Sequence, residues 1–332
     1  MTEPLLSIRG LRVEFDVPAG RLPAVGGVDL DLGAGELVAI VGESGSGKSA
    51  LAMSLAGLNR GPRAHISGTA TLRGTDLIAA SERELRAVRG KDIAVVFQDA
   101  LAALNPTQKV GAQISEMLRA HQRMSRRAAW ARSVALLREV GIANPEQRAK
   151  AYPHQLSGGM RQRVMIAIGL ANEPSVLIAD EPTTALDVTI QAQVLRLLER
   201  LRTDHGTTVV LITHDLGVVA EVADRVAVMY AGRIVEQGTR DQVLFAPQHP
   251  YTKALLASVP RIDGPAQKRL PAIAGNPLTG VTRPPGCAFA PRCAFAHERC
   301  TSEVPALTQR YGQPGQLDAC VLGPDREEVA VP

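Results

Sequence analysis

One stretch of the chain, Gly42-Glu43-Ser44-Gly45-Ser46-Gly47-Lys48-Ser49, reads G-x-x-x-x-G-K-S, the pattern of a phosphate-binding P-loop. It follows the apolar run 37–41, which is typical of a buried strand, and precedes a stretch, 49–58, that has the composition of a helix. Such a loop wraps backbone N–H groups around phosphate oxygens, and the helix N-terminus adds a favourable field. We therefore expect Lys48 to reach the β- and γ-phosphates of a nucleotide and the Ser49 hydroxyl to hold magnesium. The alternative is an incidental glycine-rich turn before a helix.

The composition indicates a globular protein of about two units. The chain has 332 residues, of which 45% are apolar and 21% charged. The net charge of +4 and the pI of about 9.0 suit an anionic ligand or a membrane-adjacent surface, but they do not indicate a nucleic-acid partner. No apolar run reaches the roughly 18 residues that span a bilayer, and the first residues lack the features of a signal peptide.

Hydrophobic periodicity predicts an α/β chain. Strands are predicted at 5–16, 28–32, 69–72, 93–99, 175–181, 207–213, 226–230 and 233–236. Pro18, Gly20 and Pro23 are expected to interrupt the strand pattern near the N-terminus. Helical spacing between 108 and 170 indicates a helical insertion, and a further helix is predicted at 190–204. Beyond about residue 245 prolines accumulate, so we expect an appended segment with little core of its own.

Two carboxylates, Asp180 and Glu181, close the apolar run that begins at Ser175. Hydrolysis of a nucleotide requires an oriented water molecule and neutralised phosphate charge. We predict that Asp180 orders magnesium and that Glu181 polarises the water as the general base. The alternative is a pair of solvated carboxylates at the end of a strand.

A second glycine motif, Leu156-Ser157-Gly158-Gly159-Met160, precedes a helical run. Ser157 and its two glycines can present backbone N–H groups and a helix N-terminus to phosphate. One P-loop already serves the phosphates of one subunit, so a second anion-binding turn indicates a site shared by two subunits. A local turn with a helix cap is the alternative. On these residues the chain resembles the ATP-binding cassette (ABC) family, whose signature L-S-G-G-Q has Met160 here in its fifth place.

This resemblance implies roles for further residues. Gln98 is similar to the glutamine that touches magnesium and reports to a membrane partner, and Asp187 is similar to the aspartate of a loop that crosses to the other subunit. His214 matches a histidine that contacts the γ-phosphate, and Phe15 matches an aromatic residue that stacks on adenine. Taken alone, these four residues are a loop amide, a helix N-cap, a structural histidine and a core phenylalanine. Catalysis is thereby assigned to Gln98, Glu181 and His214; magnesium to Ser49, Gln98 and Asp180; and ATP to Phe15, Gly42, Ser44, Gly45, Ser46, Gly47, Lys48, Ser49, Ser157, Gly158, Gly159 and Asp187.

Within the family, the chain resembles the ATPase subunits of oligopeptide/dipeptide importers. The stretches that carry this resemblance are 156–166, 179–189, His249-Pro250-Tyr251-Thr252 and the cysteine pattern near the C-terminus. The implied function is ATP hydrolysis that drives uptake of di- or oligopeptides. An importer of another solute, such as nickel, and a soluble ABC ATPase not coupled to transport are the alternatives. The implied fold is an α/β P-loop core with an antiparallel β-subdomain: an ABC ATPase domain at 1–245, its helical subdomain at about 100–170, and a C-terminal extension at 246–332.

The resemblance also implies partners, because the sequence predicts no membrane span. These are two transmembrane permease subunits, a second ABC ATPase subunit that is identical or a paralogue, and an extracytoplasmic solute-binding protein. The implied location is peripheral, on the cytoplasmic face of the cell (inner) membrane.

All four cysteines, Cys287, Cys293, Cys300 and Cys320, lie near the C-terminus. A disulfide is not expected without a secretion signal. Zinc prefers closer cysteine pairs, although His297 could complete a mixed thiolate–imidazole site. Iron–sulfur ligation tolerates varied spacing, and some subunits that resemble this one carry a [4Fe–4S] cluster. We predict that the four cysteines are ligands of such a cluster, with zinc or free structural thiols as the alternatives.

Overall fold

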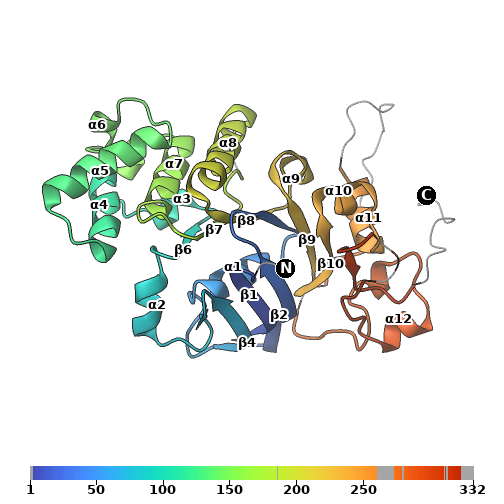
Figure 1. Cartoon of the computed structure of the whole chain (residues 1–332). Coiled ribbons are helices and arrows are strands. Elements are labelled where there is room, and N and C mark those ends of the chain that lie inside the picture. The colour runs from blue at the N-terminus through green and yellow to red at the C-terminus, as the bar shows by residue number, and fades with distance from the viewer. Residues whose placement is uncertain are drawn as a thin grey trace. The chain divides into compact units, whose positions relative to one another are not determined.

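The computed structural model describes residues 3–184, 186–259, 273–278, 280–309, 311 and 313–322. The chain divides into two compact units (Figure 1). The first is made of Met1–Leu6, Leu32–Leu37 and Thr71–Ile212, and the second of Ser7–Asp31, Val38–Ala70 and Thr213–Pro332. None of the described helices is long and apolar enough to cross a membrane.

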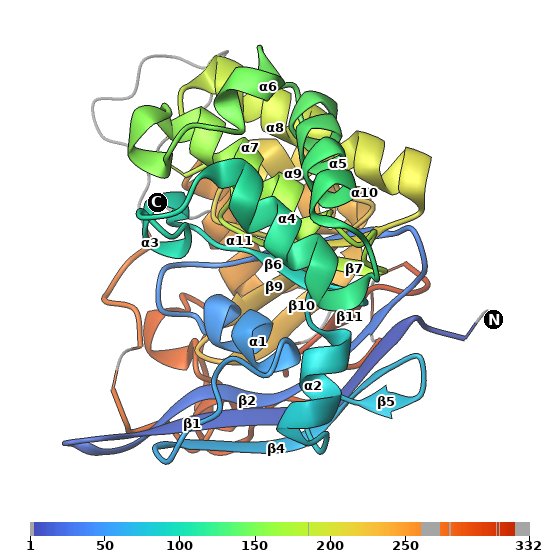
Figure 2. The same cartoon turned by 90° about the vertical axis from the view of Figure 1, so that its left-hand side faces the viewer.

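The second unit contains the P-loop and strands of two sheets. In one sheet the strand order is β2-β1-β4, with β1 at Leu6–Val17, β2 at Gly20–Leu32 and β4 at Ala64–Leu72. In the other, β3 (Leu37–Val41) runs parallel to β9 (Arg225–Tyr230), which forms an antiparallel hairpin with β10 (Arg233–Thr239). The short strand β11 (Leu317–Asp318) pairs antiparallel with β10. Figure 2 shows the helix after the P-loop, α1, beside the sheet β2-β1-β4. The helices of this unit are α1 (Lys48–Leu55), α9 (Leu216–Val222), α10 (Arg240–Phe245), α11 (Pro250–Ala257) and α12 (Glu298–Ser302), with a 3-10 turn, η2, at Ala290–Arg292.

The first unit is built on the parallel strands β6 (Ile93–Val96), β7 (Val176–Asp180) and β8 (Thr208–Thr213), in the order β6-β7-β8. All residues of β7 and β8 are buried, as expected for strands covered on both faces. The small strand β5 (Thr75–Asp76) pairs with the end of β4. The helices are α2 (Glu82–Val88), α3 (Ala100–Ala103), α4 (Val110–His121), α5 (Arg126–Glu139), α6 (Pro145–Arg148), α7 (Gly158–Gly169) and α8 (Val188–His205), with a 3-10 turn at Pro153–Gln155.

The structure confirms the α/β class, the hairpin of β9 and β10 and the helical insertion, within which α4, α5 and α7 pack on one another. It differs from the sequence expectation at β2, which begins at Gly20 and runs through Pro23. β2 is an edge strand, and proline is tolerated there because an edge strand leaves backbone N–H groups without ladder partners.

The segment after residue 245 also differs from expectation, because it has a buried core. Tyr251 is fully buried and Phe289 is 3% exposed, and their ring centroids lie 5.3 Å apart. Cys300 is also buried. Aromatic residues supply large apolar area per residue, so a few of them give this proline-rich segment a core that periodicity does not reveal.

Candidate nucleotide-binding and hydrolysis site

The P-loop requires glycine at two positions for steric reasons. Gly42 and Gly47 have φ values of 155° and 102°, which residues other than glycine rarely adopt. A Cβ atom at Gly42 would overlap the backbone oxygen of Met229, and one at Gly47 would overlap that of Ala24. The loop backbone therefore lies directly against neighbouring strands, which fixes the directions of its N–H groups.

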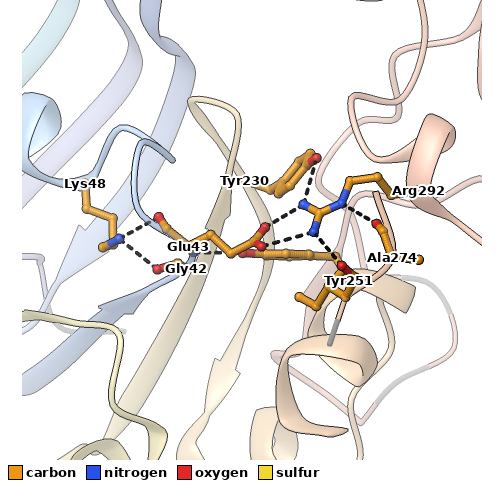
Figure 3. Close-up of polar contacts among 8 residues, drawn as sticks. Gly42, Glu43, Lys48, Tyr230, Tyr251, Ala274 and Arg292 are labelled. Atoms are coloured by element: carbon orange, nitrogen blue, oxygen red, sulfur yellow. Dashed lines mark hydrogen bonds and ion pairs between the residues drawn. The ribbon is translucent and has the colours of Figure 1, made fainter. Parts of the chain in front are cut away.

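Lys48 is buried at the start of α1, and its ammonium group contacts the loop itself. Nζ donates to the backbone oxygens of Gly42, at 2.8 Å, and Glu43, at 2.9 Å (Figure 3). It also lies 3.4 Å from Ser46 Oγ. The residue before α1 provides no side-chain cap, since it is a glycine. A positive charge and backbone donors thus gather at one loop, which is the chemistry that binds phosphate.

A second group of predicted residues meets at the end of β7. Asp180 is 5% exposed, and Glu181 follows it with a left-handed φ of 46°. The Glu181 carboxylate accepts hydrogen bonds at Oε2 from Gln98 Nε2 and from Thr184 Oγ1, both at 2.9 Å. Its backbone N–H donates to Ile212 O at 2.9 Å.

The structure therefore brings together Gln98 and Glu181, which lie 83 residues apart in the sequence. The sequence analysis did not single out Thr184, although Asp180-Glu181-Pro182-Thr183-Thr184 places a hydroxyl three residues after the carboxylate. Two donors on one oxygen hold the Glu181 carboxylate in a defined direction, as a general base requires.

The signature motif begins α7, and Ser157 is its N-cap. Ser157 Oγ accepts from Met160 N at 3.4 Å, and the Ser157 and Gly158 residues are exposed. Gly159 is close to α8, because a Cβ atom there would lie 2.6 Å from Ile190 Cγ2. Asp187 caps α8 by accepting from Ile190 N at 2.9 Å. The capping interpretation of Ser157 and Asp187 is confirmed, and capping leaves both residues on the surface.

His214 and Phe15 lie in the same unit as the P-loop. His214 is exposed after the last residue of β8, and Phe15 is partly exposed on β1 rather than in the core. Gln98, Ser157, Asp180, Glu181 and Asp187 belong to the first unit.

The four cysteines lie around a single small cavity with a volume of about 10 Å³. Cys300 and Cys320 are buried, and Cys287 N donates to Cys300 O at 2.8 Å. Burial raises the pKa of the Cys287 thiol and raises the pKa of Cys293 to about 11, so both are neutral near pH 7. His249 lines this cavity, whereas His297, the candidate ligand of the alternative zinc site, does not.

The described residues contain no group of three or more His, Cys, Asp or Glu side chains arranged to hold a metal ion. A cavity of about 10 Å³ is also no larger than the space that one water molecule needs. The four thiols line one cavity, as a cluster site would require. As they stand, however, the described residues do not form a metal site.

Two residues that the sequence analysis did not assign to ATP also reach the P-loop. The hydroxyl of Tyr251 accepts from Glu43 N at 2.9 Å, and Arg292 forms an ion pair with the Glu43 carboxylate at 2.7 Å. No local sequence signal marks these contacts, because each partner is more than 200 positions from Glu43.

Comparison with known proteins gives consistent results along the chain. The model of a family described as "ABC transporter" matches residues 25–184, and that of "Oligopeptide/dipeptide transporter, C-terminal region" matches residues 235–300. The dipeptide transport ATP-binding protein DppD of Bacillus subtilis is 49% identical over 330 residues, covering 99% of this chain and 98% of that protein. The oligopeptide transport ATP-binding protein OppD of Salmonella typhimurium is 46% identical over 316 residues, covering 95% and 93%.

Solved structures give the same fold. The dimeric structure of the ATP-binding cassette MJ0796 with ADP and Pi has a TM-score of 0.64 and 28% identity, covering 71% of this chain and 98% of that one. Part of the cbiONQ transporter, cbiO1 from Clostridium perfringens, has a TM-score of 0.60 and 29% identity, covering 73% and 91%. On its fold, its P-loop and its likeness to relatives over nearly the whole length, the chain belongs to the ABC transporter family, in the group of ATP-binding proteins that carry the oligopeptide/dipeptide transporter C-terminal region.

Proposed function

We propose that this chain is the ATP-hydrolysing subunit of an importer that carries di- or oligopeptides across the cytoplasmic membrane. ATP hydrolysis follows from family membership. The peptide substrate is supported by relatives named as dipeptide and oligopeptide transport proteins and by the match of residues 235–300. The observation that carries the chemistry is the Glu181 carboxylate, held by Gln98 and Thr184 at the end of β7.

Each predicted residue receives a role in this proposal. Backbone N–H groups of the P-loop and the Lys48 ammonium bind phosphate oxygens, and Phe15 stacks on adenine. Glu181 accepts the proton of the attacking water, and His214 contacts the γ-phosphate. Oxygen donors suit Mg²⁺, which neutralises phosphate charge when bound. The proposed sets are Gly42, Ser44, Gly45, Ser46, Gly47, Lys48, Ser49 and Phe15 for ATP; Ser49, Gln98 and Asp180 for magnesium; and Ser157, Gly158, Gly159 and Asp187 for the nucleotide of a second subunit.

The test of the base is the substitution Glu181→Gln. Glutamine keeps the size of the side chain but cannot accept a proton, so ATP should still bind while turnover falls about 100-fold or more. Glu221→Gln, an exposed position on α9, is the matched control and should hydrolyse ATP at the wild-type rate. Near-normal turnover in Glu181→Gln would place the base elsewhere.

The proposed function implies partners, which a reconstitution in proteoliposomes must supply. We propose that the chain works with two transmembrane permeases, a second ABC ATPase and an extracytoplasmic solute-binding protein, as a peripheral subunit on the cytoplasmic face. The proposed division is an ATPase domain at 1–245, with its helical subdomain at about 100–170, and an extension at 246–332. ATP-dependent uptake of a radiolabelled dipeptide would support the proposal. Uptake of nickel but not of peptide would show that the transported solute is a metal ion. No uptake with any permease pair would favour an ATPase that is not coupled to transport.

We also propose that Cys287, Cys293, Cys300 and Cys320 bind a [4Fe–4S] cluster. The support is the chemistry of the donors, four thiols around one cavity. The described residues form no ready-made metal site and the cavity lined by the four cysteines measures only about 10 Å³, so cluster binding requires the thiols to rearrange. Anaerobic purification followed by metal and sulfide analysis tests this. About four iron and four sulfide per chain would support the cluster, while about one zinc or no metal would remove it.

A further inference from the structure

The ion pair between Arg292 and Glu43 joins the C-terminal extension to the P-loop. Arg292 Nη1 donates to Glu43 Oε2 at 2.7 Å, and Nη2 donates to Oε1 at 3.1 Å (Figure 3). The Arg292 side chain is 4% exposed and that of Glu43 is 22% exposed. Such a two-pronged, mostly buried pair fixes direction as well as distance, unlike a surface ion pair.

Arg292 is itself held by two backbone oxygens of the extension and by one hydroxyl group on β9. Nε donates to Ala274 O at 2.8 Å, Nη2 contacts Ile273 O at 3.3 Å, and Nη1 contacts the Tyr230 hydroxyl at 3.4 Å. Together with the two bonds to Glu43, these contacts use all five N–H donors of the guanidinium group. The group also lies 5.9 Å from the centroid of the Phe289 ring. Its position is therefore determined by the packing of the extension against β9.

Glu43 connects this pair to the phosphate-binding lysine. Its backbone N–H donates to the buried hydroxyl of Tyr251, and its backbone oxygen accepts from Lys48 Nζ at 2.9 Å. Figure 3 shows the three contacts converging on this one residue. A shift of Glu43 thus changes the surroundings of the Lys48 ammonium as well as the shape of the loop.

The charge of Glu43 also needs a partner, because it lies on a loop that binds anions. An unpaired carboxylate on the P-loop would repel the phosphates of ATP and attract the Lys48 ammonium away from them. Arg292 neutralises this carboxylate. It does not itself bind the phosphates, because its N–H donors are all used within the protein.

We propose that Arg292 is a positioning residue for ATP hydrolysis, which holds the P-loop through Glu43 and cancels its charge. Through this contact the folded state of the cysteine-containing extension sets the affinity of the nucleotide site. Arg292 directly precedes Cys293 and ends the turn Ala290–Arg292 at the cysteine cavity, so rearrangement there reaches the P-loop. The inference rests on ATP binding and hydrolysis by this chain.

The test is a set of variants of the full chain, assayed for binding of a fluorescent ATP analogue and for ATPase kinetics. Arg292→Met removes both hydrogen bonds to the Glu43 carboxylate and leaves it unpaired beside the bound phosphates, so we expect Kd and KM for ATP to rise about tenfold. We expect kcat to change much less, because no catalytic group is altered. Glu43→Gln combined with Arg292→Met removes the repulsion and should return Kd to within about threefold of wild type.

The recovery in the double variant separates this role from a merely structural one. If Arg292 only stabilised the extension, the double variant would bind ATP as weakly as Arg292→Met, and the proposal would be overturned. Arg299→Met is the matched control, because it breaks an exposed ion pair with Glu303 in the same extension, and its Kd should equal that of wild type.

Arg292→Lys serves if Arg292→Met does not fold. Lysine keeps the charge but cannot make the two-pronged contact, so Kd should rise about threefold, and an unchanged Kd would contradict the proposal. A wild-type chain without ATPase activity would instead refute the proposed function. An active wild type whose Arg292 variants bind ATP normally would refute only the inference.

Discussion

At the scale of single residues, two glycines of the P-loop differ in what surrounds them. Gly47 has a φ of 102°, and a Cβ atom there would overlap the backbone oxygen of Ala24. Gly45 has a φ of 77°, yet a Cβ atom there would meet nothing within 4 Å. The first position is restricted by strain and by collision, and the second by strain alone.

We predict that Gly47→Ala lowers the free energy of unfolding by about 3 kcal/mol and abolishes nucleotide binding, because a backbone collision forces the loop to move. Gly45→Ala should lower it by only about 1 kcal/mol. Thermal denaturation and binding of a fluorescent ATP analogue measure both effects. Equal losses for the two variants would show that local strain, not the contact with Ala24, controls the loop.

The residues to which the sequence assigns a role are those that stand in local motifs. Lys48, Ser157 and Glu181 stand in short motifs beside apolar runs, so their types and spacing are visible without a structure. Arg292 was not singled out, and Tyr251 was quoted only as part of a subfamily motif with no role at the P-loop. Their partner Glu43 is 249 and 208 positions away, and a long-range pair leaves no local pattern. Side chains that are distant in the sequence meet only through the tertiary fold.

At the scale of elements, a buried carboxylate ties the extension to the sheet. Glu236 on β10 is fully buried and accepts from the backbone N–H groups of Gln248, at 2.7 Å, and His249, at 2.9 Å, just before α11. It also accepts from Gln316 Nε2 at 2.9 Å, beside β11. Burial raises the pKa of Glu236, although these hydrogen bonds act in the opposite direction.

We predict a specific pH dependence from this group. The raised pKa means that the native state holds a proton above pH 4.5, where the unfolded chain has lost it. The contribution of Glu236 to the free energy of unfolding is therefore fully present at low pH. It declines as the pH rises through the pKa of Glu236 in the native state. Because the amide introduced by Glu236→Gln does not titrate, the melting temperature of wild type should fall relative to that of this variant as the pH rises above about 4.5.

Calorimetry of both proteins across this range measures the difference, and other titrating groups cancel because the two chains share them. A melting temperature of wild type that stays constant or rises relative to that of Glu236→Gln as pH increases would show that Glu236 is ionised in the native protein. As a further check, Glu298→Gln, an exposed position on α12 of the extension, should leave the pH profile unchanged.

Strands were predictable where burial is complete on both faces. The runs of β3, β7 and β8 are short, apolar and bounded by polar residues, so their boundaries were close to those observed. β2 and the extension were less visible. A proline on an edge strand and a core built from a few aromatic residues both escape a search for periodicity.

At the scale of the whole molecule, the exposed motifs indicate association with a second ATPase. Ser157 and Asp187 cap helices while remaining on the surface, and Val188, beside Asp187, is 83% exposed. Both capping residues are therefore accessible to a second chain. The similar cassette MJ0796 is described as dimeric in its solved structures.

We predict that Glu181→Gln forms a dimer when ATP is added, because ATP binds but is not consumed, and the bound phosphates then join the P-loop of one copy to Ser157 of the other. Sedimentation velocity with and without ATP measures the change. Ser157→Arg in the same background should keep the chain monomeric by placing a bulky side chain at the start of α7. Glu221→Gln in that background, on exposed α9, is the control and should dimerise. A chain that binds ATP yet stays monomeric would show that its partner is a paralogue rather than a second copy.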